Sequence, residues 1–130
     1  FNPKEFFELK FLKQDTMTDM PYTIYAEGFY RALHQASILN KPIFVTENGI
    51  ADLKDINRVK YIEQYLYALS RALEDGLDIR GYYYWSLLDN FEWAFGYDMK
   101  FGLYEVDFKT QKRTLRNGSK TFQKIVQQNN

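Results

Sequence analysis

The chain has 130 residues, of which 45% are hydrophobic and 26% are charged, a composition typical of a globular domain long enough to bury a core. Seventeen basic residues balance seventeen acidic ones, so charge gives no reason to expect a nucleic-acid or membrane partner. The absence of cysteine excludes a disulfide framework, a thiol nucleophile and cysteine-ligated metal sites.

The two ends of the chain bear on its extent and location. No apolar run approaches the roughly 20 residues of a membrane span, and no segment resembles a signal peptide. We therefore expect a cytoplasmic protein. The sequence opens on Phe1 rather than Met, in what looks like a loop, so we expect its natural start to lie upstream.

The first regular element that the pattern predicts is a helix over residues 24–39. Residues 1–20 lack a clear period, and we interpret them as an irregular connection. From residue 24 apolar side chains recur at steps of three and four, and Asn40 and Pro42 end the run. His34, the only histidine, lies in this helix. No Ser–His or Cys–His relay can be built around it, so we interpret it as a surface or packing residue.

A short strand follows and ends in a carboxylate. Ile43, Phe44 and Val45 form an unbroken apolar run, which predicts a strand covered on both faces in a parallel sheet. Glu47 then sits at its carboxyl end, where α/β folds bind ligands. Four residues, Thr-Glu-Asn-Gly, specify little by themselves, and a solvated loop residue is the simpler interpretation of Glu47 in isolation.

The clearest helix of the sequence comes next. Its apolar positions step by three or four residues, and they are Ile56, Val59, Ile62, Leu66, Leu69 and Leu73. We expect Asp52 or Asp55 to cap this helix and Gly76 to end it. A second strand is predicted over residues 79–85. Strand, helix and strand form a parallel βαβ unit, which places Glu47 and the residues after Trp85 on one rim.

The remaining elements surround a long loop. Residues 86–98 are too irregular for a turn and too apolar for a solvated loop, and loops of this length are commonly functional. Residues 102–108 alternate like an edge or hairpin strand, and residues 109–116 are interpreted as a turn whose basic side chains are solvated. A closing helix from about Asn117 or Ser119 is expected to turn three residues inward: Phe122, Ile125 and Val126.

The residues on the rim suit carbohydrate chemistry. Glu47 could attack an anomeric carbon as the nucleophile of a retaining glycosidase. Trp85 could lie under the sugar ring, Glu92 could accept hydrogen bonds from two hydroxyls, and Trp93 could donate from its ring nitrogen. Core packing for the two tryptophans and a surface charge for Glu92 are about equally good interpretations from spacing alone.

A metal or cofactor finds little support in the sequence. Asp89, Glu92 and Asp98 offer hard oxygen ligands, but they follow neither an EF-hand pattern nor a zinc spacing. The glycines are scattered, so no phosphate-binding loop is present. We expect neither a metal nor a cofactor.

Several motifs together resemble the carboxyl-terminal part of family 1 glycoside hydrolases, the β-glucosidase family. They are Thr46-Glu47-Asn48-Gly49, the run Gly81-Tyr82-Tyr83-Tyr84-Trp85-Ser86-Leu87-Leu88-Asp89-Asn90-Phe91-Glu92-Trp93, Gly96-Tyr97 and Phe101-Gly102-Leu103. The segment Tyr25-Ala26-Glu27-Gly28-Phe29-Tyr30 resembles the opening of the helix before the family's seventh strand. The similarity extends from Met17 onward, and the motifs are specific only in combination.

The resemblance implies an α/β fold, a (β/α)8 TIM barrel of which residues 1–130 supply the last two βα units as the carboxyl-terminal fragment of one catalytic domain. Glu47 then matches the nucleophile, Trp85 the platform under the glycone, and Glu92 with Trp93 the pair that binds sugar hydroxyls. Phe101 matches an aromatic residue of the same pocket. The resemblance also implies a cis peptide between Trp85 and Ser86 and an unphosphorylated glycone.

The chain lacks part of what such an enzyme needs. The family's general acid lies in an Asn-Glu-Pro segment, which does not occur in this sequence. A TIM barrel needs about 250 residues, more than are present. We therefore expect a fragment that is inactive alone and that hydrolyses β-glucosides or β-galactosides only with a missing amino-terminal part. The partner we expect is that part of the barrel or a further copy of the chain. The alternative is a non-catalytic partial barrel that binds carbohydrate or self-associates. The aglycone, the choice between glucose and galactose, and the oligomeric state stay open.

Overall fold

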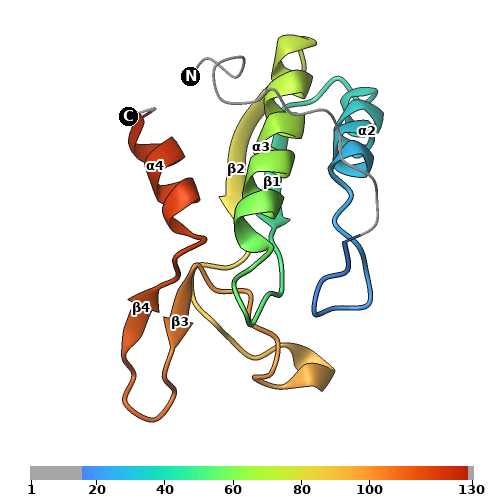
Figure 1. Ribbon diagram of the computed structural model, residues 1–130. Coiled ribbons are helices and arrows are strands. Elements are labelled where there is room, and N and C mark those ends of the chain that lie inside the picture. Colours follow the sequence, from blue (N-terminus) through green and yellow to red (C-terminus); the bar gives the residue numbers. More distant parts are fainter. Residues whose placement is uncertain (1–15, 129–130) are drawn as a thin grey trace.

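The computed structural model describes residues 16–128 and shows an α/β arrangement built on a two-stranded parallel sheet (Figure 1). The sheet consists of β1 (Ile43–Asn48) and β2 (Ile79–Tyr84). Helix α3 (Arg58–Glu74) connects these strands and packs between α2 (Ala26–Ser37) and α4 (Lys120–Gln128). A short 3-10 helix, η1 (Trp93–Phe95), precedes an antiparallel pair, β3 (Tyr104–Val106) and β4 (Arg113–Leu115).

The predicted βαβ unit is confirmed. Strands β1 and β2 run parallel, with Val45 opposite Tyr82 and Asn48 opposite Tyr84. Their carboxyl ends therefore lie at the same edge of the sheet, from which the loops before α3 and before β3 depart.

The start and the end of α3 are fixed as expected. One carboxylate oxygen of Asp52 accepts hydrogen bonds from the backbone nitrogens of Asn57 and Arg58, each at 2.8 Å. Asp52 thus satisfies amide groups that have no partner within the helix. At the other end Gly76 adopts a φ of 87°, the left-handed conformation that glycine takes without a steric penalty.

The core lies on one face of the sheet only. Leu33 of α2, Val45 of β1 and Ala72 of α3 are buried together, and Ile62 and Leu66 of α3 form a neighbouring cluster with Leu103. Through these clusters α2, α3 and α4, which are far apart in the sequence, pack over the same side of β1 and β2. The helices therefore leave the opposite side of the sheet open among residues 16–128.

That open face corrects the prediction of a strand covered on both sides. The side chain of Val45 is 8% exposed, but Phe44 is 53% exposed and Tyr83 of the neighbouring strand is 60% exposed. Phe44 also packs close to Gly81, where a Cβ would lie 2.8 Å from its ring. The apolar run Ile43–Val45 correctly predicted a strand. Its composition suits a strand buried on both faces, but the described part of the chain covers only one face.

Three further expectations for the carboxyl-terminal part need correction. The segment interpreted as a turn contains β4, because residues 104–106 pair with 113–115 as a hairpin. Arg116 is not a solvated basic residue but is 7% exposed. In α4, Phe122 and Ile125 pack against the core as predicted, whereas Val126 is 43% exposed.

Two other sequence expectations concern the helices. His34 lies on the surface of α2, where its Nε2 is 3.1 Å from a carboxylate oxygen of Asp75. In the part of the chain that is described, no helix is both long enough and apolar enough to cross a bilayer.

Candidate active site

Glu47 lies at the carboxyl end of β1 and lines a pocket of about 390 Å³ at the edge of the sheet. Four residues singled out from the sequence, Glu47, Trp85, Glu92 and Phe101, line this rim pocket together. In the sequence, α3, β2 and the loop after β2 lie between Glu47 and Phe101, and the parallel pairing of β1 with β2 brings the two residues to one place. The remaining lining residues are Met20, Tyr22, Asn48, Gly49, Tyr61 and Tyr65.

Trp93 is not brought into the rim pocket. It begins η1 with a φ of 41° and is 82% exposed, more than any other large hydrophobic side chain among residues 16–128. Its neighbour Glu92 is half-buried, and the Glu92 backbone nitrogen donates to the carbonyl of Gly96 at 2.6 Å. The tight turn 92–96 thus separates the predicted pair, with one member facing the pocket and the other facing solvent.

The ends of the two strands meet immediately beside Glu47. The backbone nitrogen of Trp85 donates to the carbonyl of Asn48 at 3.0 Å, and the Tyr82 hydroxyl donates to the Asn48 side-chain oxygen at 2.8 Å. A Cβ on Gly49 would lie 1.4 Å from the carbonyl oxygen of Trp85, so only glycine allows this approach. The Trp85–Ser86 peptide bond is cis, as the resemblance implied.

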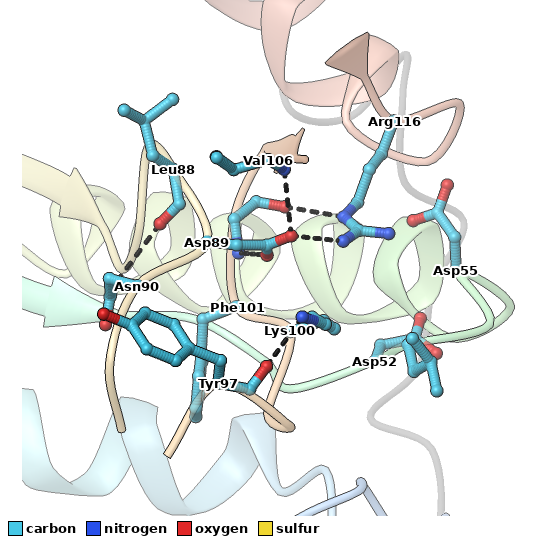
Figure 2. Close-up of polar contacts among 12 residues, drawn as sticks. Asp52, Asp55, Leu88, Asp89, Asn90, Tyr97, Lys100, Phe101, Val106 and Arg116 are labelled. Atoms are coloured by element: carbon cyan, nitrogen blue, oxygen red, sulfur yellow. Dashed lines mark hydrogen bonds and ion pairs between the residues drawn. The ribbon is translucent and has the colours of Figure 1, made fainter. Parts of the chain in front are cut away.

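A buried ion pair holds the base of residues 85–103, which we call the second loop (Figure 2). One oxygen of Asp89 accepts from the Gly102 backbone nitrogen at 2.9 Å, and the other accepts from Val106 at 3.3 Å and from Arg116 at 2.7 Å. The Arg116 Nε donates to the Gly102 carbonyl at 3.2 Å. Charge and backbone groups are therefore satisfied together, and the loop carrying Trp85, Glu92 and Phe101 is closed at its base.

The start of the second loop has its own short-range bonds. The Ser86 hydroxyl donates to the Leu88 carbonyl at 2.7 Å, and the Asn90 amide donates to both the Ser86 hydroxyl and the Leu88 carbonyl, at 2.9 and 3.1 Å. Figure 2 shows the contact between Leu88 and Asn90 beside Asp89. These bonds give a definite shape to a segment that has no regular secondary structure.

A metal site finds no support in these contacts. Asp89, one of the oxygen ligands considered from the sequence, is already occupied by three hydrogen-bond donors. Among residues 16–128 no group of three or more His, Asp or Glu side chains is placed so as to hold a metal ion.

Tyrosines form one wall of the rim pocket, and sequence reasoning missed them. The rings of Tyr61 and Tyr65 stack with their centroids 4.0 Å apart. Burial, assisted by the charge of Glu92, raises the pKa of Tyr22 to about 12, and burial raises the pKa of Tyr61 still further. The wall therefore presents neutral phenols beside the carboxylates. The high aromatic content was the only sequence signal for this wall. The apolar spacing of α3 does not distinguish Tyr61 and Tyr65 from other positions of the helix.

Fold and site together define a class of protein. A parallel α/β unit that gathers a carboxylate and aromatic side chains at the carboxyl edge of its strands is the arrangement of α/β enzymes, whose sites lie at that edge. The model of one family, described as glycosyl hydrolase family 1, matches residues 4–130. The chain belongs to glycosyl hydrolase family 1.

Curated relatives agree with this assignment. A β-galactosidase of Pyrococcus woesei is 45% identical over 114 residues, which are 87% of this chain and 22% of the relative. β-Glucosidase 47 of Arabidopsis thaliana is 47% identical over 93 residues, 67% of this chain and 17% of the relative. The chain thus spans about a fifth of the length of these relatives.

Solved structures give the same result. The β-glycosidase from Pyrococcus horikoshii superposes with a TM-score of 0.83 at 44% identity, over 95% of this chain and 30% of the other. The β-glucosidase from Pyrococcus furiosus gives a TM-score of 0.85 at 41% identity, over 89% of this chain and 25% of the other. The chain therefore matches part of the family's barrel structures, and its described residues do not close a barrel.

Proposed function

We propose that this chain is the carboxyl-terminal part of the catalytic domain of a retaining β-glycosidase, supplying its last two βα units, and that Glu47 is the nucleophile. The observation that supports this most strongly is the meeting of Glu47, Trp85, Glu92 and Phe101 in one pocket at the carboxyl edge of β1 and β2. The relatives' names, β-galactosidase and β-glucosidase, support β-galactosides and β-glucosides as the substrate class.

The reaction proceeds in two steps. A Glu47 carboxylate oxygen attacks the anomeric carbon as the bond from that carbon to the aglycone oxygen breaks, which leaves a glycosyl ester on Glu47. A general acid gives its proton to the departing oxygen. In the second step the same group, now a base, takes a proton from water, whose oxygen attacks the anomeric carbon and releases Glu47 and the sugar.

The pocket's other residues bind the sugar. Trp85 lies under the ring, whose C–H groups stack on the indole. Glu92 accepts hydrogen bonds from two sugar hydroxyls, and its negative charge strengthens these bonds. Phe101 forms part of the pocket lining. Trp93 donates from its indole nitrogen. Its place in the proposal rests on the resemblance, because Trp93 lies outside the rim pocket. Glu92 and Trp93 favour an unphosphorylated glycone.

The general acid comes from outside these 130 residues, which contain no Asn-Glu-Pro segment. In retaining enzymes the two carboxyls lie roughly 5 Å apart. The open face of β1 and β2, with Phe44 and Tyr83 exposed, suits the interior of a barrel that further strands complete. We propose that the amino-terminal strands of the same domain cover this face and bring the acid opposite Glu47.

The same exposed face supports a second candidate. An apolar sheet face and unpaired strand edges favour association between copies, so the chain could serve as a non-catalytic partial barrel that self-associates or binds carbohydrate. The two candidates differ in whether Glu47 forms a glycosyl ester.

The test compares three proteins: the chain alone, the chain assembled with the amino-terminal strands, and the assembled protein carrying Glu47→Gln. Intact masses are checked first, and release of nitrophenol from an aryl β-glucoside is then followed. We expect the chain alone to be silent and the assembled protein to be active. Glu47→Gln should lower kcat by roughly a thousandfold or more, because groups that act as a unit fail together.

Two outcomes decide between the candidates. Hydrolysis by the assembled protein that survives Glu47→Gln would show that the nucleophile lies elsewhere. An assembled protein that is silent but still binds glucose in a titration would favour the non-catalytic candidate. Glu105→Gln, at an exposed position of β3, serves as the matched control, since Glu105 does not line the rim pocket.

A further inference from the structure

Arg58 is a charged side chain that the proposed reaction does not use, and it is completely buried. It is the first residue of α3, and its side chain is 0% exposed. A buried charge is costly unless hydrogen bonds and a counter-charge compensate it. The contacts of its guanidinium group therefore show which parts of the structure Arg58 holds together.

One set of contacts leads to residues 49–57, the first loop, which follows Glu47. The Nε of Arg58 donates to the Asp55 carboxylate at 2.8 Å. The Nη2 donates to the Asp52 carbonyl at 3.1 Å, and the Nη1 donates to the Ile50 carbonyl at 3.3 Å. Ile50 lies three residues after Glu47 and is itself 0% exposed, so the guanidinium binds this loop close to the end of β1.

A second set of contacts leads to β2 and the second loop. The Nη1 of Arg58 also donates to the Tyr84 hydroxyl at 2.9 Å and to the Phe101 carbonyl at 3.2 Å, and the Nη2 donates to the Lys100 carbonyl at 3.0 Å. Tyr84 immediately precedes Trp85, and Phe101 lines the rim pocket.

One guanidinium thus joins the first loop, which follows Glu47, to the end of β2 and to Phe101, which lines the rim pocket. A single backbone bond, from the Asp52 nitrogen to the Lys100 carbonyl at 3.1 Å, links the same loops without reaching Tyr84 or Phe101. The planar fork of arginine presents its donors in fixed directions, which lysine cannot reproduce. Replacement by an apolar side chain would leave buried carbonyl groups without donors.

We propose that Arg58 is a positioning residue of the glycosidase reaction: it holds Phe101 and the Tyr84–Trp85 strand end in register with Glu47. This inference rests on the proposed function. Its mechanism is geometric, because the sugar sits on the second-loop wall while the attacking oxygen belongs to β1. A displacement of about 1 Å between reacting groups can lower a rate by about a hundredfold. Loss of Arg58 should therefore lower kcat more than it weakens sugar binding.

The test uses the assembled protein and the variant Arg58→Lys, which keeps the charge and loses the fork. Arg80→Lys is the matched control, because Arg80 is exposed and pairs with Asp78. Circular dichroism and thermal unfolding establish that each variant is folded at the assay temperature. We expect Arg58→Lys to lower kcat for an aryl β-glucoside by about tenfold or more while KM changes by less than about threefold. Arg80→Lys should match the wild type.

A milder variant keeps the proposal falsifiable if Arg58→Lys does not fold. Tyr84→Phe removes one acceptor of the Arg58 Nη1 and keeps the ring that packs in the core. We expect a fall in kcat of about threefold. Tyr30→Phe, which removes a hydroxyl bonded to Asp75 on the surface of α2, is its control and should leave kcat unchanged.

The outcomes are distinguishable. A folded Arg58→Lys variant with kcat within about twofold of the wild type, or with a raised KM and unchanged kcat, would overturn the positioning role even if its melting temperature falls. Where Arg58→Lys is unfolded, an unchanged kcat in Tyr84→Phe overturns it. If the wild type shows no hydrolysis that depends on Glu47, the proposed function itself fails and the positioning role falls with it.

Discussion

Replacing Asp89 by asparagine tests whether the buried ion pair holds the second loop in place. The Asp89 side chain is 1% exposed and that of Arg116 is 6% exposed, so neither reaches water freely. The exchange is not neutral at this site, because Asp89→Asn removes the negative charge and turns one acceptor into a donor. The new amide group would face either the Gly102 nitrogen or the pair of donors from Val106 and Arg116.

The magnitude follows from those contacts. Removal of one partner from a buried ion pair leaves an uncompensated charge and typically costs about 3–5 kcal/mol of the free energy of unfolding. With a urea dependence of about 2 kcal/mol per molar, a loss of about 4 kcal/mol lowers the unfolding midpoint by about 2 M. The double variant Asp89→Asn/Arg116→Met should be less destabilised than the sum of its two single variants, because no buried charge is left unpaired.

The assay is urea unfolding of the 130-residue chain, followed by tryptophan fluorescence. Trp85 and Trp93 are the two tryptophans of the sequence, and both belong to the second loop. The signal therefore reports on the segment that Asp89 is expected to hold. Asp78→Asn is the matched control: Asp78 also pairs with an arginine at 2.8 Å, but the two side chains are 53% and 59% exposed. Exposed pairs of this kind contribute little, so no resolvable shift is expected.

The reasoning would be refuted if Asp89→Asn moved the midpoint no further than Asp78→Asn. Full additivity in the double variant would also contradict it, since two residues that form one buried pair must be coupled. A lower midpoint together with coupling would support the ion pair as the anchor of the second loop.

Two further predictions concern the strand ends and the tyrosine wall. Gly49→Ala places a methyl group against the carbonyl oxygen of Trp85, so we expect a loss of at least about 3 kcal/mol from overpacking; an unchanged thermal midpoint would contradict the close approach. The pKa of Tyr22 is raised to about 12 and that of Tyr61 is raised further, mainly by burial. The folded state therefore retains protons that the unfolded chain loses near pH 10, and stability that is intact below about pH 10 should fall as the pH rises toward 12. Tyrosinate absorbance during an alkaline titration measures this, and reversible ionisation of every tyrosine near pH 10 would show that the wall is not buried.

Local pattern predicted much of the secondary structure. The apolar steps from Ile56 to Leu73 led to a helix observed over Arg58–Glu74, and Asp52 caps it as one of the two expected candidates. These features depend on neighbours within a few residues, and such interactions can be recognised from spacing. The hairpin partner β4 was missed, because three exposed or half-buried residues carry no distinctive period.

The candidate site was predictable in part. Glu47, Trp85, Glu92 and Phe101 were chosen from motifs, and the parallel βαβ unit brings them into one pocket. Trp93 was chosen by the same reasoning and points to solvent, because the turn at η1 decides its direction. Their roles in a reaction stay predictions. The tyrosine wall was not predicted, since nothing in the period of α3 indicates what its Tyr61 and Tyr65 face.

By itself, the sequence determined the order of the helices and strands apart from η1 and β4, the placement of a carboxylate at the end of β1 and the family resemblance. Tertiary structure alone decided the burial of Arg58 and Arg116 and the exposure of Phe44. Arg58 bonds to partners 26 and 43 residues away, and Arg116 bonds to Asp89 27 residues away. Such contacts depend on how the loops fold back against the sheet. The sequence alone does not show whether a given arginine is exposed or buried. The exposure of Phe44 likewise depends on which face the helices cover, a choice made only when α2, α3 and α4 pack together.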